Sequence, residues 1–182
     1  MIRIGIDPSI NCTGVCVSVG DKNIYYMIPS KVTKKMAAFC HQFIHINNYI
    51  KDDTNGKEYE DKEVAKTNNI YNICNILQSI ISQYKDVEVI MEGVSYGSVG
   101  SAALVDLSGL NFAIRMTLRN LNIPFAIVSP TSVKKFAVAN GQAEKDIMID
   151  AWKRLDKNIS DIKDIKIDDL ADAYFLAHYE KI

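Results

Sequence analysis

The sequence lacks the features of a membrane, secreted or strongly basic protein. In 182 residues no apolar run approaches the ~20 residues that a helix needs to span a bilayer. The first residues also lack the charged region, apolar stretch and cleavage site of a signal peptide. The four cysteines have no disulfide-framework spacing, which favours a reducing compartment. We therefore expect a cytoplasmic protein without a membrane partner.

Charge is nearly balanced overall but unevenly distributed along the chain. The formal net charge is −1, yet residues 51–63 are acidic and residues 115–154 are rich in lysine and arginine. A near-neutral total argues only weakly against nucleic acid binding, because the distribution of charge matters more than its sum. The sequence therefore leaves room for a basic face.

The chain is patterned as one globular domain over residues 1–182, without internal repeats or low-complexity tracts. Its first third predicts three antiparallel strands, and the rest alternates helices with short buried strands. This order predicts an α/β fold with a mixed sheet and helices on both faces. Residues 33–50 mix helical and strand character, residues 52–58 are predicted as a loop, and residues 158–166 as a polar linker. The predicted strands are 2–8, 13–20, 23–29, 87–92 and 123–130, and the predicted helices are 60–84, 102–121, 129–140, 143–155 and 168–179.

Four acidic residues stand at the ends of predicted elements. Asp7 interrupts the apolar first strand, and Glu92 ends the strand VEVIME. Asp169 and Asp172 lie three residues apart on the last helix, so both carboxylates project from one face, while Asp168 points roughly 100° away. Taken singly, each acid is more simply a turn or helix-terminus residue. Taken together, they predict a hard-cation site for Mg²⁺ or Mn²⁺, because Zn²⁺ prefers histidine and cysteine.

The motifs GIDPSINCTG, VIMEG, VKKFAVANGQAEK and DDLADA, in this order, resemble the RuvC family of Holliday junction resolvases within the RNase H-like superfamily. The first motif is also typical of actin-like ATPases, but those need two such domains and a much longer chain. Two departures from the family pattern stand out. Ser9 replaces a glycine of the family, and an enlarged variable segment occupies residues 31–63. Such a variant, rich in isoleucine, asparagine and lysine, fits the cytoplasm of a low-GC bacterium or a phage-infected host.

The resemblance implies an RNase H-like nuclease whose catalytic carboxylates are Asp7, Glu92, Asp169 and Asp172. It implies that these four residues hold two Mg²⁺ (or Mn²⁺) ions ~4 Å apart, with no small-molecule cofactor. The turn over residues 9–14 would let a phosphate approach the backbone closely. The partner implied is branched DNA, a four-way junction that a homodimer nicks symmetrically on opposed strands in recombination or repair. The ends would carry 5′-phosphate and 3′-hydroxyl groups.

Basic and aromatic residues near these motifs are candidate nucleic-acid contacts. The resemblance maps the family's basic segment onto Lys134 and Lys145, with Lys135 beside them, although a solvated helix face would use the same residues. Tyr96 lies in the glycine-rich stretch after Glu92, where the family offers an aromatic that stacks on an unpaired base. A surface tyrosine is the simpler alternative.

Other candidates are weaker. Cys40, His41 and His45 lack the further ligands of a zinc site. Cys12 and Cys16 lie on one face of a predicted strand and are most simply core residues. The apolar stripe of the 102–121 helix either faces the core or, as in the resembling family, contributes to dimerisation.

Two further functions compete with a DNA junction nuclease. One is a nuclease of the same type acting on structured RNA, such as a ribosomal RNA precursor. The other is a catalytically silent scaffold that binds branched DNA or a protein. The full set of four acids argues against the scaffold, because a non-catalytic domain has no reason to hold repelling carboxylates together.

Overall fold

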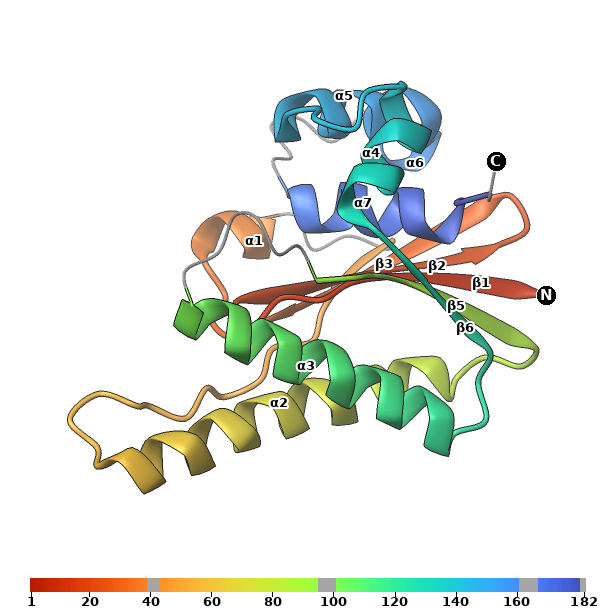
Figure 1. Ribbon diagram of the computed structural model, residues 1–182. Helices are drawn as coiled ribbons and strands as arrows, with labels where there is room; N and C mark the ends of the chain where they lie inside the picture. The colour runs from red at the N-terminus through yellow and green to blue at the C-terminus, as the bar shows by residue number, and fades with distance from the viewer. Residues whose placement is uncertain (39–42, 95–100, 161–166, 181–182) are drawn as a thin grey trace.

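A six-stranded mixed sheet forms the centre of the computed structural model, which describes residues 1–38, 43–94, 101–160 and 167–180 (Figure 1). Its strand order is β4-β3-β2-β1-β5-β6. β2 runs antiparallel to β1 and β3, whereas β4 is parallel to β3, β5 to β1, and β6 to β5. This arrangement confirms the predicted mixed sheet. The strands are β1 (Ile2–Asp7), β2 (Cys12–Val19), β3 (Lys22–Pro29), β4 (Ile44–Ile46), β5 (Val87–Glu92) and β6 (Phe125–Val128).

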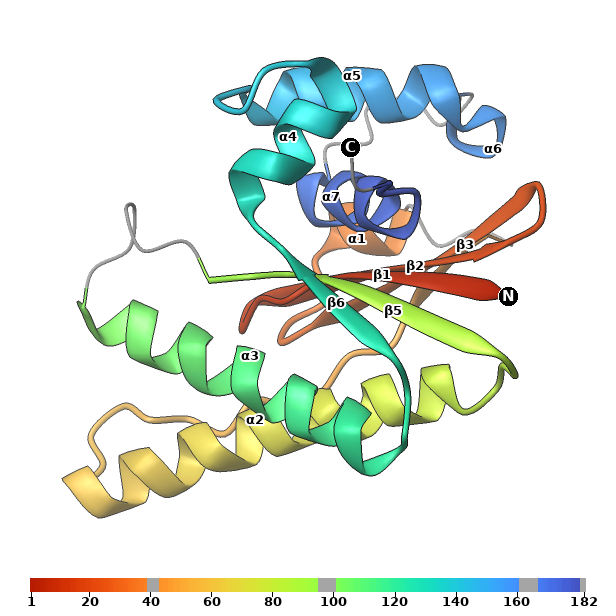
Figure 2. The ribbon, with the colours of Figure 1, turned by 45° about the vertical axis from the view of Figure 1, so that its right-hand side comes forward.

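Helices cover both faces of the sheet (Figure 2). Two long helices, α2 and α3, lie on one face, and α7 lies on the other with α4 and α5 packed over it. In the described part of the chain, no helix is long and apolar enough to cross a membrane. The helices are α1 (Lys34–Ala38), α2 (Tyr59–Ile81), α3 (Ser101–Asn120), α4 (Pro130–Val138), α5 (Lys145–Leu155), α6 (Lys157–Ser160) and α7 (Asp168–Ala177).

The alternation of side chains along the central strands builds a separate core on each face. Ile4 and Ile6 of β1 and Val15 of β2 are fully buried on the α2–α3 side. On the opposite face, Cys16 of β2 and Tyr25 of β3 are fully buried under α5 and α7. Because the central strands are buried on both faces, their buried side chains are mostly apolar, and an acidic residue at a strand end stands out.

The predicted stripe of α3 packs into the core. Leu110, Ile114 and Leu118 are buried at helical spacing in the cluster that also holds the residues of α2 and β1. Of the two interpretations of this stripe, the packing in the structure matches the core-facing one.

The segment over residues 31–63, which the sequence left unassigned in part, adds a short helix and a sixth strand at the sheet edge. α1 precedes β4, which pairs with β3. After β4 the chain contacts the turn between β1 and β2, where the Tyr49 hydroxyl donates to the Ile10 carbonyl at 2.6 Å. It then contacts α2, where the Asp52 amide donates to Oδ1 of Asn69 at 2.8 Å. The short helix α6 overlaps the first residues of the predicted linker, 158–160.

Candidate active site

The carboxyl ends of β1 and β5 bring the first two acids together. These strands are parallel neighbours with Ile6 opposite Met91, so Asp7 and Glu92 leave the sheet at the same edge. Their side chains are hydrogen-bonded to each other. Because β5 pairs with β1 in a fixed register, the strand pairing itself sets how close the carboxyl groups of Asp7 and Glu92 lie.

Helix α7 supplies the other two acids by packing directly on glycine. A Cβ atom on Gly14 would lie 2.2 Å from the carbonyl oxygen of Asp169, and one on Gly5 would lie 2.0 Å from that of Ala173. Any side chain at either position would push the helix away from the sheet. These two glycines therefore allow Asp169 and Asp172 to reach the strand-end acids.

Burial and mutual repulsion disfavour ionisation of the first pair. Burial, followed by the charges of Glu92, Asp172 and Asp169, raises the pKa of Asp7 well above its ordinary value. Burial and the charge of Asp172 raise the pKa of Glu92 to about 7, although Lys134 acts in the opposite direction. In the hydrogen bond between the pair, Asp7 is the protonated partner that donates to Glu92.

The acids of α7 are perturbed in the same direction. Burial and the charge of Asp168 raise the pKa of Asp169 to about 7 and that of Asp172 to about 6. A hydrogen bond from the Cys12 thiol to Asp169 works against this shift. Near neutral pH the four acids therefore hold fewer than four negative charges.

The donor set fits a hard divalent cation. All four groups are carboxylates, the ligands that Mg²⁺ and Mn²⁺ prefer, and each has a pKa that a nearby cation would lower. Among the described residues, however, no three His, Cys, Asp or Glu side chains are already placed to hold one ion. Ligation would therefore need rotation of these side chains as the repulsion between them is relieved.

Two lysines flank the acids from α4 and α5. Lys134 lowers the pKa of Glu92 and Asp172, and Lys145 lowers that of Asp169 and Asp172. Both lysines line one open hollow of about 530 Å³. The α4 helix that carries Lys134 begins at an N-cap, where the Ser129 hydroxyl accepts from the Ser132 amide at 3.2 Å.

No model of a protein family matches the sequence, and no curated protein matches it either. The fold, however, is similar to solved structures. Thermus thermophilus RuvC matches with a TM-score of 0.61 and 16% identity, over 97% of this chain and 91% of that one. The same protein in complex with Holliday junction substrate matches with a TM-score of 0.61 and 14% identity, over 97% and 90%. The yeast mitochondrial Holliday junction resolvase Ydc2 matches with a TM-score of 0.55 and 16% identity, over 96% and 75%.

This chain has the RuvC fold. The RNase H-like α/β architecture expected from the four motifs is thereby confirmed. This fold brings the four predicted acids together at the carboxyl end of β1, with Lys134 and Lys145 beside them. Lys135 is exposed on α4 and is not among the residues that perturb the acids.

The structure describes only some of the weaker candidates. Tyr96, Cys40 and His41 lie outside the described residues. His45 stacks on Tyr26, with ring centroids 5.1 Å apart. Cys16 is fully buried, as predicted for a core residue.

Three residues play parts that sequence reasoning missed. Gly14 lies within β2, in agreement with the predicted strand 13–20, but it also lets the α7 backbone pack directly against the sheet. Cys12 is buried as predicted but also binds a candidate ligand, Asp169. Asp168, which the helix geometry places away from the face of Asp169 and Asp172, forms an ion pair with Lys145. The only signal for this pair is that both residues lie in polar motifs near helix starts.

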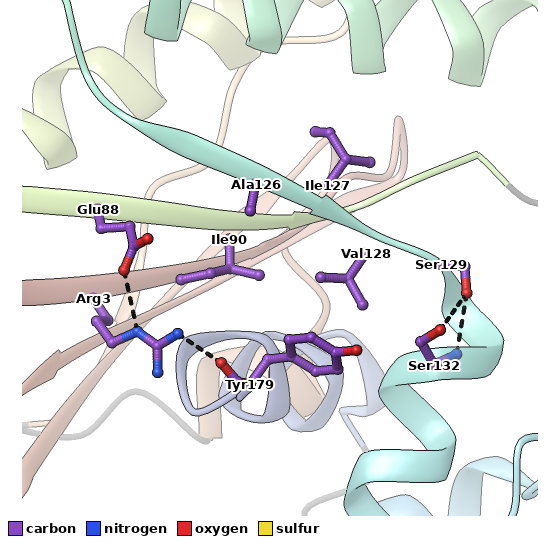
Figure 3. Close-up of a pocket in the computed structure, with 9 residues that line it drawn as sticks. All are labelled: Arg3, Glu88, Ile90, Ala126, Ile127, Val128, Ser129, Ser132 and Tyr179. Atoms are coloured by element: carbon purple, nitrogen blue, oxygen red, sulfur yellow. Dashed lines mark hydrogen bonds and ion pairs between the residues drawn. The ribbon is translucent and has the colours of Figure 1, made fainter. Parts of the chain in front are cut away.

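A cavity of about 460 Å³ lies elsewhere, beside β5 and β6 (Figure 3). Apolar side chains and the Tyr179 ring line it. At one end Arg3 donates to the Tyr179 carbonyl oxygen at 2.6 Å and pairs with Glu88 at 3.5 Å. None of the four acids lines this cavity, so we place the candidate active site at the acids instead.

Proposed function

We propose that this protein is a metal-dependent endonuclease that resolves Holliday junctions. The observation that carries the proposal is the convergence of Asp7, Glu92, Asp169 and Asp172, from two strands and a helix, at one end of a RuvC fold. The cluster raises the pKa of its own members and so destabilises the folded protein at neutral pH. Because the cluster costs stability, we infer that its negative charge serves a function, which we propose is the binding of metal ions.

Phosphodiester hydrolysis is the chemistry that the cluster suits. Bound divalent cations, two in the proposal, would supply an activated water and stabilise the charge that develops on the phosphate. Asp7, on the central strand, is the residue best placed to share both ions, with Glu92 on one side and the two acids of α7 on the other. The four carboxylates would bind and orient, while Lys134 and Lys145 neutralise the phosphates beside the scissile bond.

A four-way DNA junction is the proposed substrate. Two of the similar structures are named for Holliday junctions, one as a complex with that substrate and one as a resolvase. Resolution needs two opposed nicks, so the proposal includes a homodimer with one active site per subunit, each built on a single nuclease domain over residues 1–182. The cuts would leave 5′-phosphate and 3′-hydroxyl ends.

A synthetic immobile four-way junction, labelled on each strand in turn, tests the proposal. The protein is incubated with it in Mg²⁺, in Mn²⁺ and in EDTA, beside Asp7→Asn and, as a matched control, Asp21→Asn. Asp21 is exposed in the turn between β2 and β3, which lies at the opposite end of the strands from Asp7 because β2 runs antiparallel to β1. We expect paired, symmetric nicks that need the metal, disappear in Asp7→Asn and persist in Asp21→Asn.

Each other outcome points elsewhere. Cleavage of RNA stems in preference to the junction would refute the DNA junction as the substrate and favour structured RNA instead. Tight junction binding without nicks in either metal would refute the enzyme and favour a silent scaffold. Equal cleavage of a linear duplex would refute selectivity for branched DNA.

A further inference from the structure

Lys145 is tied to an acid that lies outside the proposed ligand set. Its ammonium forms an ion pair with the Asp168 carboxylate across the gap between the first residues of α5 and α7. The Lys145 side chain is 76% exposed, whereas that of Asp168 is 26% exposed. The fixed member of the pair is therefore Asp168, and the lysine is the member that is free to turn.

The same lysine borders the hollow that it shares with Lys134. Gln142, Glu144 and Asp146 complete the polar part of this hollow, which opens to solvent beside the acids. A lysine ammonium is a compact charge on a flexible stem with three donors. Lys145 can therefore face either Asp168 or a phosphate that enters the hollow. Because the Asp168 carboxylate already neutralises the Lys145 ammonium, the phosphate would have to compete with that carboxylate.

We propose that Asp168 is a built-in competitor of DNA: it holds Lys145 in the free protein and releases it to a backbone phosphate when DNA binds. The inference rests on the proposed function and deepens it by assigning a regulatory role to one residue beside the site. Asp168 lowers DNA affinity by making Lys145 exchange one negative partner for another. Its effect on affinity must therefore depend on Lys145.

A double-mutant cycle on binding tests this dependence without metal or cleavage. The probes are a fluorescein-labelled four-way junction and a linear duplex of equal length, both in EDTA and at constant salt. The variants are Asp168→Asn, Lys145→Gln and the double variant, each checked by thermal unfolding. Partly exposed ion pairs are worth the equivalent of about a two- to fivefold change in Kd, so Asp168→Asn should tighten binding by that factor. In the Lys145→Gln background the same substitution should leave Kd unchanged.

Asp146→Asn is the matched control. Asp146 follows Lys145 on α5, is exposed and lines the same hollow, but in the described structure the ion pair of Lys145 is with Asp168. Removing its charge should give a smaller gain that is equal in both backgrounds.

The outcomes separate the two ideas. If Asp168→Asn tightened binding equally with and without Lys145, the effect would be general charge removal and the competitor role would be refuted. Weaker binding by Asp168→Asn would also refute it, because Asp168 would then hold Lys145 in the DNA-binding position. Equal affinity of the unmodified protein for junction and duplex would contradict the proposed substrate while leaving the Lys145 dependence readable on both probes. Failure to bind either DNA would overturn both proposals.

Discussion

Replacing Glu92 by glutamine should stabilise the metal-free protein while abolishing cleavage. Burial and the charge of Asp172 raise the pKa of Glu92 from its ordinary 4.5 to about 7. A carboxyl whose pKa is higher in the folded state than in the unfolded state costs no stability below the unfolded value. For Glu92, the free energy lost by the folded protein grows as the pH rises from 4.5 to about 7, and the loss is complete above that range. Glutamine removes the charge but still accepts the hydrogen bond from Asp7.

The size of the effect follows from the pKa shift. Each pKa unit corresponds to ~1.4 kcal/mol, so the ionised Glu92 costs the folded protein at most about 3–4 kcal/mol. Because the side chain is partly exposed, water screens part of this energy, and we expect a gain of about 1–3 kcal/mol. For a chain of this length that corresponds to a rise in Tm of about 2–12 °C.

Thermal unfolding in EDTA at about pH 4.5 and about pH 8 measures this gain. The unmodified protein should lose stability between the two pH values, and Glu92→Gln should lose less. Glu88→Gln, four residues earlier on β5, is the matched control, because the Glu88 carboxylate pairs with Arg3 instead of other acids. If Glu92→Gln were less stable than the unmodified protein at the higher pH, the idea that the acids repel one another would be refuted.

Three further predictions concern the framework around the acids. Gly14→Ala should cost about 1–3 kcal/mol in denaturant unfolding and reduce cleavage, because its Cβ would meet the Asp169 backbone, whereas Gly109→Ala, whose Cβ would lie 3.4 Å from Ile70, should be neutral or stabilising. Lys134→Gln should move the acid limb of the single-turnover cleavage profile to higher pH, since Lys134 lowers the pKa of Glu92 and Asp172; an unmoved limb would show that it acts on DNA alone. Asp156→Ala should cost about 2–4 kcal/mol in the same unfolding assay, since it strands the Tyr25 hydroxyl and the Asn23 amide; an unchanged midpoint would contradict this.

The predictions from sequence held where the signal was local and failed where it depended on packing. Strand β5 was predicted to the residue, because a short apolar run that ends in an acid and a glycine has clear limits. β4 was not predicted, because it is three residues long and is held mainly by pairing with β3. The packing role of Gly14 was missed for a related reason. The local sequence places this glycine at the start of a strand, and only the position of α7 reveals that the residue must lack a side chain.

Two acids of this chain, Asp156 and Glu92, show why the sequence alone could not separate structure from function. Asp156 is 3% exposed and accepts hydrogen bonds from the Asn23 side chain at 3.0 Å, the Tyr25 hydroxyl and the Asn158 amide at 2.9 Å. Its surroundings are donors, so its loss should destabilise the fold. Glu92 is surrounded by other carboxylates, so its neutralisation should stabilise the fold and remove the activity. Opposite signs in one unfolding assay would therefore assign Asp156 to the core and Glu92 to the chemistry, whereas equal signs would place both in the framework.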